Sequence, residues 1–381
     1  MEFSWNEDQQ ALRAAAREFG ARMLTEGVEA RDRAAEFSHE LWSECAAFGL
    51  PGLVVPESLG GLGHDVMTAV AVMEGLGEGA EDNGLVFSLA AHAASVAGPI
   101  VDYGTAPQQQ QWLPRLASGA AIGAAGVTEP GTGSNALGLT TRAERDGDGW
   151  LLNGAKTFVS NAPIADLFLI YARTAPGKLA GLTAFLVPAD TPGLSVGKPI
   201  SKMGLRTSPM AEVFLDACRL EEGAVLGSVG SGGMIFNQTM DVERLLVMAP
   251  AVGVMRRLLE RCTAHARERN TGNGTLASHQ AIAHAIANME LDLEQSRLLL
   301  YRAAWAAMRQ STATRESALA KLAVSEAYVR SCRTAMQVFG GYGYTVEYGL
   351  ERELRDALAT PLYVGTSEIQ RNLSAGLRGL K

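Results

Sequence analysis

The stretch Val127-Thr128-Glu129-Pro130-Gly131-Thr132-Gly133-Ser134 lies where the pattern of this 381-residue chain changes. Before it, apolar residues recur at helical spacing between Ala, Arg and Glu, as in 8–23 and 38–48, and two more helices are expected over 66–79 and 85–101. After it, as far as Gly227, short apolar runs are divided by Gly, Pro, Asn and Asp, which is typical of strands and turns. The sequence therefore predicts helices up to about residue 119 and strands beyond that point.

The strand region is followed by a second helical region. Four runs carry the strand signal, spaced as in a small barrel or sandwich: 149–154, 167–171, 183–188 and 211–215. Residues 146–149, Asp-Gly-Asp-Gly, are expected to form a hairpin turn. Three long helices with short connections are then expected, as in a bundle: 233–269, 279–309 and 314–339. The predicted fold is mostly α with a β middle domain, divided into an N-terminal helical domain, a β domain and a C-terminal four-helix bundle: 1–119, 120–230 and 231–381.

Composition limits the classes of function. The formal net charge of −8 argues against a nucleic-acid partner, which would need a basic surface. We see no uninterrupted apolar run of membrane-spanning length and no signal peptide, so a cytoplasmic protein without a membrane partner is expected. The four cysteines are far apart, and no histidine lies in a metal-binding pattern, so no metal site is predicted.

Glu243 lies on an apolar helix face within Met240-Asp241-Val242-Glu243-Arg244-Leu245-Leu246-Val247. Its neighbours three and four positions away are mostly apolar: Thr239, Met240, Leu246 and Val247. An unpaired carboxylate in such surroundings has a raised pKa, which suits a general base working near neutral pH. The alternative is a glutamate that reaches solvent or pairs with a nearby arginine: Arg244, Arg256 or Arg257.

The stretch 127–134 resembles the VTEPGxGSD signature of the acyl-CoA dehydrogenase family. Further similarities follow in the order that the family has them, over nearly the whole chain: 153–161, 202–208, 337–344, 355–356 and 365–371. The resemblance implies the fold expected above and bound FAD. It also implies dehydrogenation of an acyl thioester between Cα and Cβ, in which a base removes the α-proton and a hydride leaves Cβ for flavin N5.

The resemblance also implies two sets of flavin contacts. The first set uses short hydroxyls and glycine N–H groups within one subunit: Val127, Thr128, Gly133, Ser134, Phe158, Ser160 and Thr366. The second set is expected to complete the flavin site of a neighbouring subunit: Arg269, Gln280, Gln337, Gly340 and Gly341. The resemblance also implies a homotetramer.

One departure from the family pattern concerns the base. Many members carry it as the Glu of a terminal "YEGT", but this chain has Val364 there, and valine cannot accept a proton. A subset typified by isovaleryl-CoA dehydrogenase carries it in "LDLERL", which 240–245 matches. The resemblance therefore implies Glu243 as base, with the Val364 N–H holding the thioester carbonyl. Arg244 is assigned a supporting role, because a guanidinium stays protonated.

Partners and alternatives follow from the same resemblance. The substrate is expected to be an acyl-CoA or an acyl group on a carrier protein, and the electron acceptor an electron-transfer flavoprotein. A flavin monooxygenase on the same fold is the main alternative. Such an enzyme needs no α-proton base, so the presence of Glu243 disfavours this alternative. A non-catalytic nucleic-acid-binding relative is disfavoured by the acidic charge balance.

Overall fold

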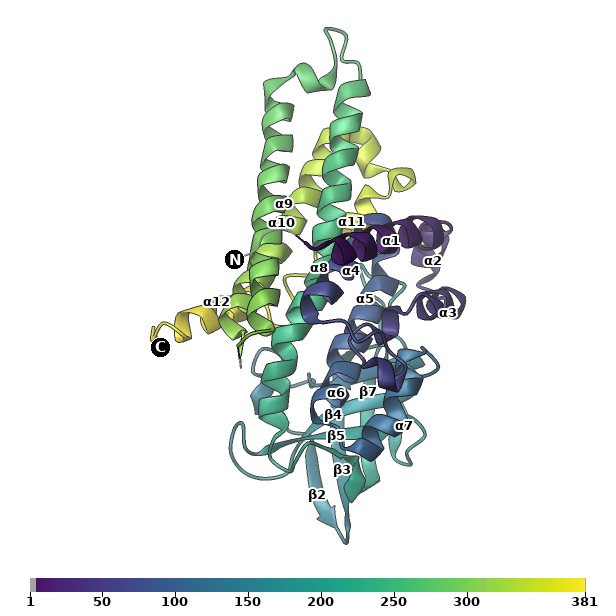
Figure 1. Cartoon of the computed structure of the whole chain (residues 1–381), viewed down its shortest axis with the longest axis vertical. Helices are drawn as coiled ribbons and strands as arrows, with labels where there is room; N and C mark the ends of the chain where they lie inside the picture. The colour runs from purple at the N-terminus through teal and green to yellow at the C-terminus, as the bar shows by residue number, and fades with distance from the viewer. Residues whose placement is uncertain (1–4, 311, 381) are drawn as a thin grey trace.

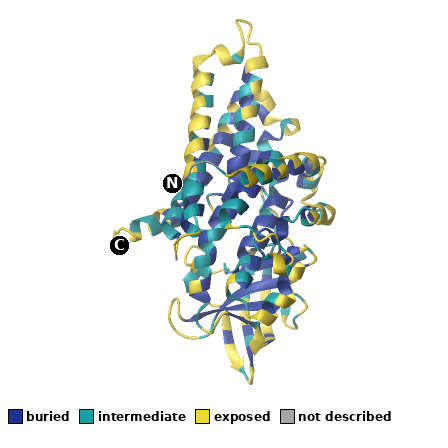
Figure 2. Ribbon diagram, in the orientation of Figure 1, coloured by how far each residue is buried: buried dark blue, intermediate teal, exposed yellow. Residues whose placement is uncertain are grey.

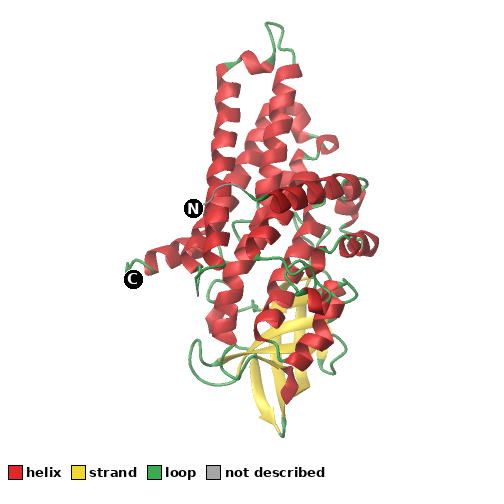
Figure 3. Ribbon diagram, viewed as in Figure 1, coloured by secondary structure: helices red, strands yellow, loops and turns green. Residues whose placement is uncertain are grey.

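The computed structural model describes residues 5–310 and 312–380, with the strands gathered at one end of a long helical body (Figures 1 and 3). Side-chain caps fix where several of the first helices begin. Asn6 and Thr105 each form a capping box, and Asp65 accepts from the backbone N–H of Thr68. The helices before the sheet are α1 (Glu7–Met23), α2 (Val28–Ala34), α3 (His39–Ala47), α4 (Val66–Gly79), α5 (Asn83–His92), α6 (Gly98–Tyr103) and α7 (Ala106–Ala117).

A π-helical turn, η3 (Ala93–Ala97), joins α5 to α6, where the sequence predicts one continuous helix over 85–101. By length and composition Asn83–Tyr103 could cross a membrane, a possibility that our sequence analysis did not identify. However, 78% of that window is buried inside the protein. A core helix of a globular protein passes the same test, so this segment is weak evidence for a membrane span.

The middle of the chain forms one mixed sheet. Its order is β6-β7-β3-β2-β4-β5-β8, and β1 pairs with β4 in parallel. Strands β2 and β3 form the hairpin that the sequence predicts, with Gly147 at φ 63° in its two-residue turn. The strands are β1 (Gly123–Gly126), β2 (Arg142–Asp146), β3 (Gly149–Ser160), β4 (Leu167–Arg173), β5 (Leu182–Pro188), β6 (Leu194–Val196), β7 (Met210–Glu221) and β8 (Val225–Leu226).

The last third of the chain is a helical bundle, which confirms the predicted fold class. The helices are α8 (Gly232–Glu268), α9 (Gln280–Ala307), α10 (Thr314–Phe339), α11 (Leu350–Ala357) and α12 (Ser367–Gly376). Helices α8 and α4 approach closely because Gly77 has no side chain. A Cβ at this position would lie only 2.2 Å from the carbonyl oxygen of Pro250. Figure 2 shows the buried interior running through the bundle, whereas the far ends of α8 and α9 are exposed.

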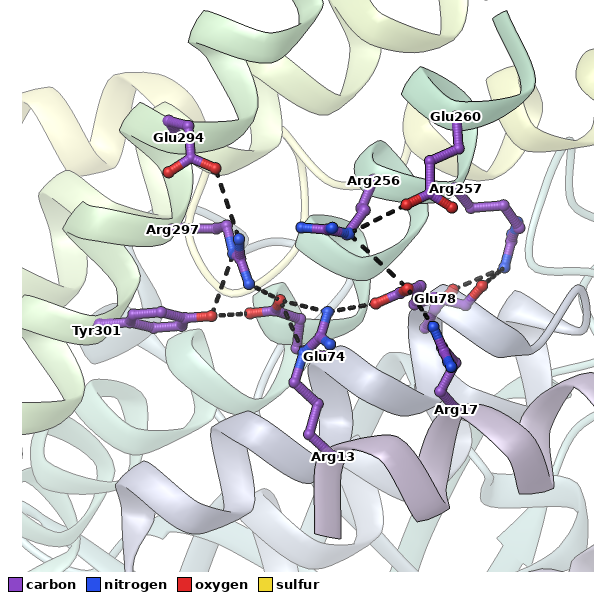
Figure 4. Close-up of polar contacts among 11 residues, drawn as sticks. Arg13, Arg17, Glu74, Glu78, Arg256, Arg257, Glu260, Glu294, Arg297 and Tyr301 are labelled. Atoms are coloured by element: carbon purple, nitrogen blue, oxygen red, sulfur yellow. Dashed lines mark hydrogen bonds and ion pairs between the residues drawn. The ribbon is translucent and has the colours of Figure 1, made fainter. Parts of the chain in front are cut away.

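Buried ion pairs join α1 and α4 to α8 and α9 (Figure 4). Glu74 is fully buried and accepts hydrogen bonds from Arg13, Arg297 and Tyr301. Because each unpaired buried charge would be costly, these contacts hold the N-terminal helices against the bundle. On α8, which carries Glu243, Arg257 donates to the Gly77 carbonyl of α4 at 2.7 Å.

Candidate active site

Glu243 lies in the first half of α8 and is partly buried. Burial raises the pKa of its carboxyl to about 7, while a hydrogen bond from Ser95 and the charge of Arg244 act in the opposite direction. Ser95 is 6% exposed and belongs to the π-helical turn η3. A carboxyl with this pKa can accept a proton near neutral pH and release it again.

The three arginines that could neutralise Glu243 have other partners. Arg244 forms its ion pair with Asp241, at 3.2 Å. Nε of Arg256 lies 3.3 Å from Oε1 of Glu260, and Nη2 of Arg257 lies 2.6 Å from Oε1 of Glu353. The alternative of a glutamate paired with one of these arginines therefore receives no support from the ion pairs of the described residues.

Arg244 connects the helix of Glu243 to α10. It donates to Ser317 Oγ at 3.3 Å, and Asp241 accepts from the Thr314 hydroxyl at 2.9 Å. One turn beyond Ser317, Lys321 donates to the carbonyl oxygen of Gly365 at 2.7 Å. These contacts link the helix that carries Glu243 to the turn that carries Val364.

The backbone of that turn is unusual. Val364 has φ 53° and Gly365 has φ 86°, and a β-branched residue rarely adopts a positive φ. Among the described residues, the Val364 N–H has no hydrogen-bond acceptor. The ring of Tyr363 packs at 4.9 Å from that of Phe87 on α5, so this turn faces the helix that leads into η3. The turn offers a free N–H donor to a ligand.

The stretch 127–134 is anchored to β3. Thr157 N–H donates to the carbonyl of Thr128 at 2.8 Å. Lys156, fully buried, donates to Glu129 at 2.8 Å, and the ammonium group holds the pKa of that carboxyl down at about 2 despite burial. Glu129 also accepts from the Thr141 N–H at 2.9 Å. The two motifs that contain Glu129 and Lys156 are therefore held together by a buried ion pair.

Around this anchor the first set of predicted flavin contacts lies on one region of the β domain. Gly131 and Gly133 face open space, since an added Cβ would meet nothing within 4 Å. Phe158 is 61% exposed at φ 55°, and Ser134 is exposed. An open glycine loop beside an exposed aromatic ring can accommodate a phosphate and a flat ring system. The remaining members of this region are partly buried: Val127, Thr128 and Ser160. Thr366 lies elsewhere, at the start of α12, where it accepts from Ile369 N–H.

The second set of predicted flavin contacts lies at the opposite end of the folded molecule. Arg269 follows α8 and Gln280 begins α9, at the end of the bundle farthest from the sheet (Figure 1). Because α8 has 37 residues, its two ends are about 55 Å apart. Arg269 lies 5.3 Å from the ring centroid of Tyr342, next to the exposed residues at the end of α10: Gln337, Gly340 and Gly341. One chain does not bring the two sets together.

Sequence reasoning missed several residues that organise this site. Glu129 and Lys156 lie inside the motifs 127–134 and 153–161, and two oppositely charged residues in neighbouring motifs are a signal for an ion pair. Lys321 interrupts an apolar run of α10, which was a signal, and Gln370 belongs to the terminal motif. Ser95 had no signal, because its orientation depends on the π-helical turn.

Family models for the N-terminal, middle and C-terminal domains of acyl-CoA dehydrogenase match residues 6–120, 124–218 and 230–376. An L-prolyl-[peptidyl-carrier protein] dehydrogenase of Pseudomonas fluorescens is 41% identical, over 89% of this chain and 90% of the relative.

Two solved structures are also similar along the whole chain. A crystal structure of the prolyl acyl carrier protein oxidase AnaB has a TM-score of 0.96 and 39% identity, covering 99% of this chain and 100% of the other. An FAD complex of PigA has a TM-score of 0.97 and 34% identity, covering 100% of both chains.

Proposed function

The chain belongs to the acyl-CoA dehydrogenase family, and we propose that Glu243 is the base of its reaction. The family and the similar structures make it an FAD-dependent enzyme that dehydrogenates acyl thioesters. The observation that supports Glu243 is a partly buried carboxyl on α8 with a pKa of about 7, while the terminal position of the base in many members is Val364. We accordingly group the chain with the subset that carries the base on this helix.

Glu243 takes the α-proton, and the acidity of that proton depends on the thioester carbonyl. We assign the free N–H of Val364 as a donor to this carbonyl, because it has no acceptor among the described residues. A donor aimed at the developing enolate oxygen stabilises the charge that forms as the proton leaves. Arg244 keeps Glu243 in place through Asp241 and Ser317 and remains protonated throughout.

Bound FAD would accept the β-hydride at N5 and contribute a ribityl hydroxyl as a second carbonyl donor. The open loop at Gly131 and Gly133 fits a pyrophosphate, and the exposed ring of Phe158 fits one face of the isoalloxazine. We propose that the rest of the first set contacts the cofactor through backbone groups and hydroxyls: Val127, Thr128, Ser134, Ser160 and Thr366.

We propose that a second copy of the chain completes each flavin site. Supporting this, the second set lies about 55 Å along α8 from the sheet end, beyond reach of a cofactor held there. Arg269 would neutralise pyrophosphate charge with its fork of N–H donors, beside Gln280, Gln337, Gly340 and Gly341. We propose that the assembly is a homotetramer and that it is located in the cytoplasm. Each subunit would have three domains, at 1–119, 120–230 and 231–381.

The proposed substrate is a small aminoacyl group, of the prolyl type, on a carrier protein. It is supported by the names of the relatives, two of which act on prolyl groups held by carrier proteins. An electron-transfer flavoprotein is the proposed electron acceptor.

A thioester panel with anaerobic flavin bleaching as readout tests the substrate. We expect prolyl carrier protein to bleach the flavin faster than prolyl-CoA or butyryl-CoA. Faster bleaching by butyryl-CoA would contradict the carrier-protein assignment and leave the dehydrogenase reaction itself intact. Bleaching by no thioester would contradict the function.

A further inference from the structure

The turn that presents Val364 has a backbone conformation that its own residues do not favour. Val364 is β-branched and has φ 53°, in the left-handed region that such residues avoid. Strained conformations of this kind persist only where surrounding groups hold them, and they gather at functional sites. The groups that hold this turn are therefore of functional interest.

Two buried side chains from different helices bind the carbonyls of this turn. Lys321 on α10 is fully buried and donates to the Gly365 carbonyl at 2.7 Å. Gln370 on α12, also fully buried, donates to the same oxygen at 2.8 Å and to the Val364 carbonyl at 3.1 Å. With both carbonyls fixed, the peptide planes on either side of Gly365 cannot rotate freely.

The space around this turn leaves little freedom. A Cβ on Gly365 would lie 2.7 Å from Gln370 Nε2 and would displace that amide, and the φ of 86° at this position also favours glycine. Burial of the Lys321 ammonium group is unfavourable and lowers its pKa to about 8, and the nearby charge of Arg244 acts in the same direction. An apolar side chain would avoid this cost but could not bind the Gly365 carbonyl.

We propose that Lys321 and Gln370 are positioning residues for the thioester carbonyl. They hold the Val364–Gly365 turn so that the Val364 N–H stays free and points into the site, and they act on the substrate only through that N–H. This inference rests on the proposed function, because the N–H matters to the reaction only if it binds the carbonyl.

The test compares Lys321→Met and Gln370→Leu with a matched control, Lys202→Met. Lys202 also donates to a backbone carbonyl, that of Ser208, at 2.6 Å, and its pKa is likewise lowered to about 8. The control therefore removes a similar contact away from the Val364 turn. The holoenzyme variants are examined for FAD content, melting temperature, and the rate of anaerobic flavin reduction by the best thioester.

A further readout reports on the carbonyl itself. A cinnamoyl thioester absorbs at longer wavelength when its carbonyl is polarised by hydrogen bonds, so its red shift on binding measures the donor. We expect both site variants to lose most of this shift and to reduce the flavin about 10- to 100-fold more slowly than Lys202→Met. FAD content should be close to that of the control.

Wild-type red shift and wild-type reduction rates in both site variants would overturn the inference. If Lys321→Met does not fold, Gln370→Leu decides by the same readouts. Failure of the wild-type enzyme to shift the probe and to bleach would instead contradict the proposed function. If the wild type shifts the absorption of the probe fully and both variants retain that shift, the positioning role is wrong and the proposed function still stands.

Discussion

The ammonium group of Lys156 lies 2.8 Å from a carboxylate oxygen of Glu129, and these side chains are 0% and 3% exposed. This pair holds the 127–134 stretch against β3. Removing one partner of a buried pair leaves an unpaired buried charge. We expect Lys156→Met to lower the free energy of unfolding by about 3 kcal/mol and to reduce FAD content, measured by urea unfolding and flavin absorbance. A loss no larger than that of the exposed-site variant Lys178→Met would contradict this role.

Glu74 should matter for stability far more than exposed carboxylates of the same network. Its partners include Arg13 at 3.1 Å and Arg297 at 3.0 Å, and its own side chain is fully buried. Glu74→Gln should lower the free energy of unfolding by about 3 kcal/mol. The control Glu260→Gln removes an exposed pair with Arg256 and should cost less than about 1 kcal/mol. Equal losses would show that burial of this network is energetically unimportant.

His92 should make the protein sensitive to acid. It is fully buried, its Nδ1 accepts from Gly123 N–H and its Nε2 donates to the Leu116 carbonyl, so the ring is neutral. Burial lowers its pKa to about 4 from an ordinary 6.5. The unfolded chain thus takes up a proton more readily, and the stability from this residue is complete above pH 6.5 and is lost between about 6.5 and 4.

The size of the acid effect can be measured with His92→Gln, which cannot titrate. Between pH 7.5 and pH 5 the wild type should lose about 2 kcal/mol more of unfolding free energy than the variant, by urea titration. The other titrating groups contribute to both proteins and cancel in this comparison. Parallel losses in the two proteins would contradict a buried neutral His92.

Arg244 should support the site through its charge and its contacts with Asp241 and Ser317. The rate of flavin reduction should rise through about pH 7 as Glu243 loses its proton. Arg244→Lys keeps the charge, so we expect reduced stability or FAD content with little change in this pH profile. Arg244→Gln removes a charge that lowers the pKa of Glu243, so its profile should move to higher pH. An unmoved profile in Arg244→Gln would contradict the electrostatic role.

The fold, and the location of Glu243 on a long helix, could be predicted because they depend on local pattern. Helical spacing indicated α4 and α10 with the bounds that the structure has, and turn residues marked the β2–β3 hairpin. The motif around Glu129 then indicated where in the sequence the strands of the sheet begin. These signals need only residues that are close together in sequence.

The contacts that shape the site depend on tertiary packing and could not be predicted. Lys321 and Gly365 are 44 positions apart and meet only because α10 and the terminal turn pack together. The π-helical turn that carries Ser95 lies within a run whose spacing predicts an ordinary helix. The parallel pairing of β1 with β4 is likewise a long-range feature without a local signal.

In the proposed reaction Glu243 removes the substrate α-proton, and the most direct test is anaerobic reduction of the flavin in Glu243→Gln. The amide occupies nearly the same space but cannot accept the proton, so the variant should fold and bind FAD as the wild type does. With the thioester that the wild type reduces fastest, we expect flavin reduction to be slower by about 10²- to 10⁴-fold. Bleaching of the variant at the wild-type rate would contradict the assignment of Glu243 as the base.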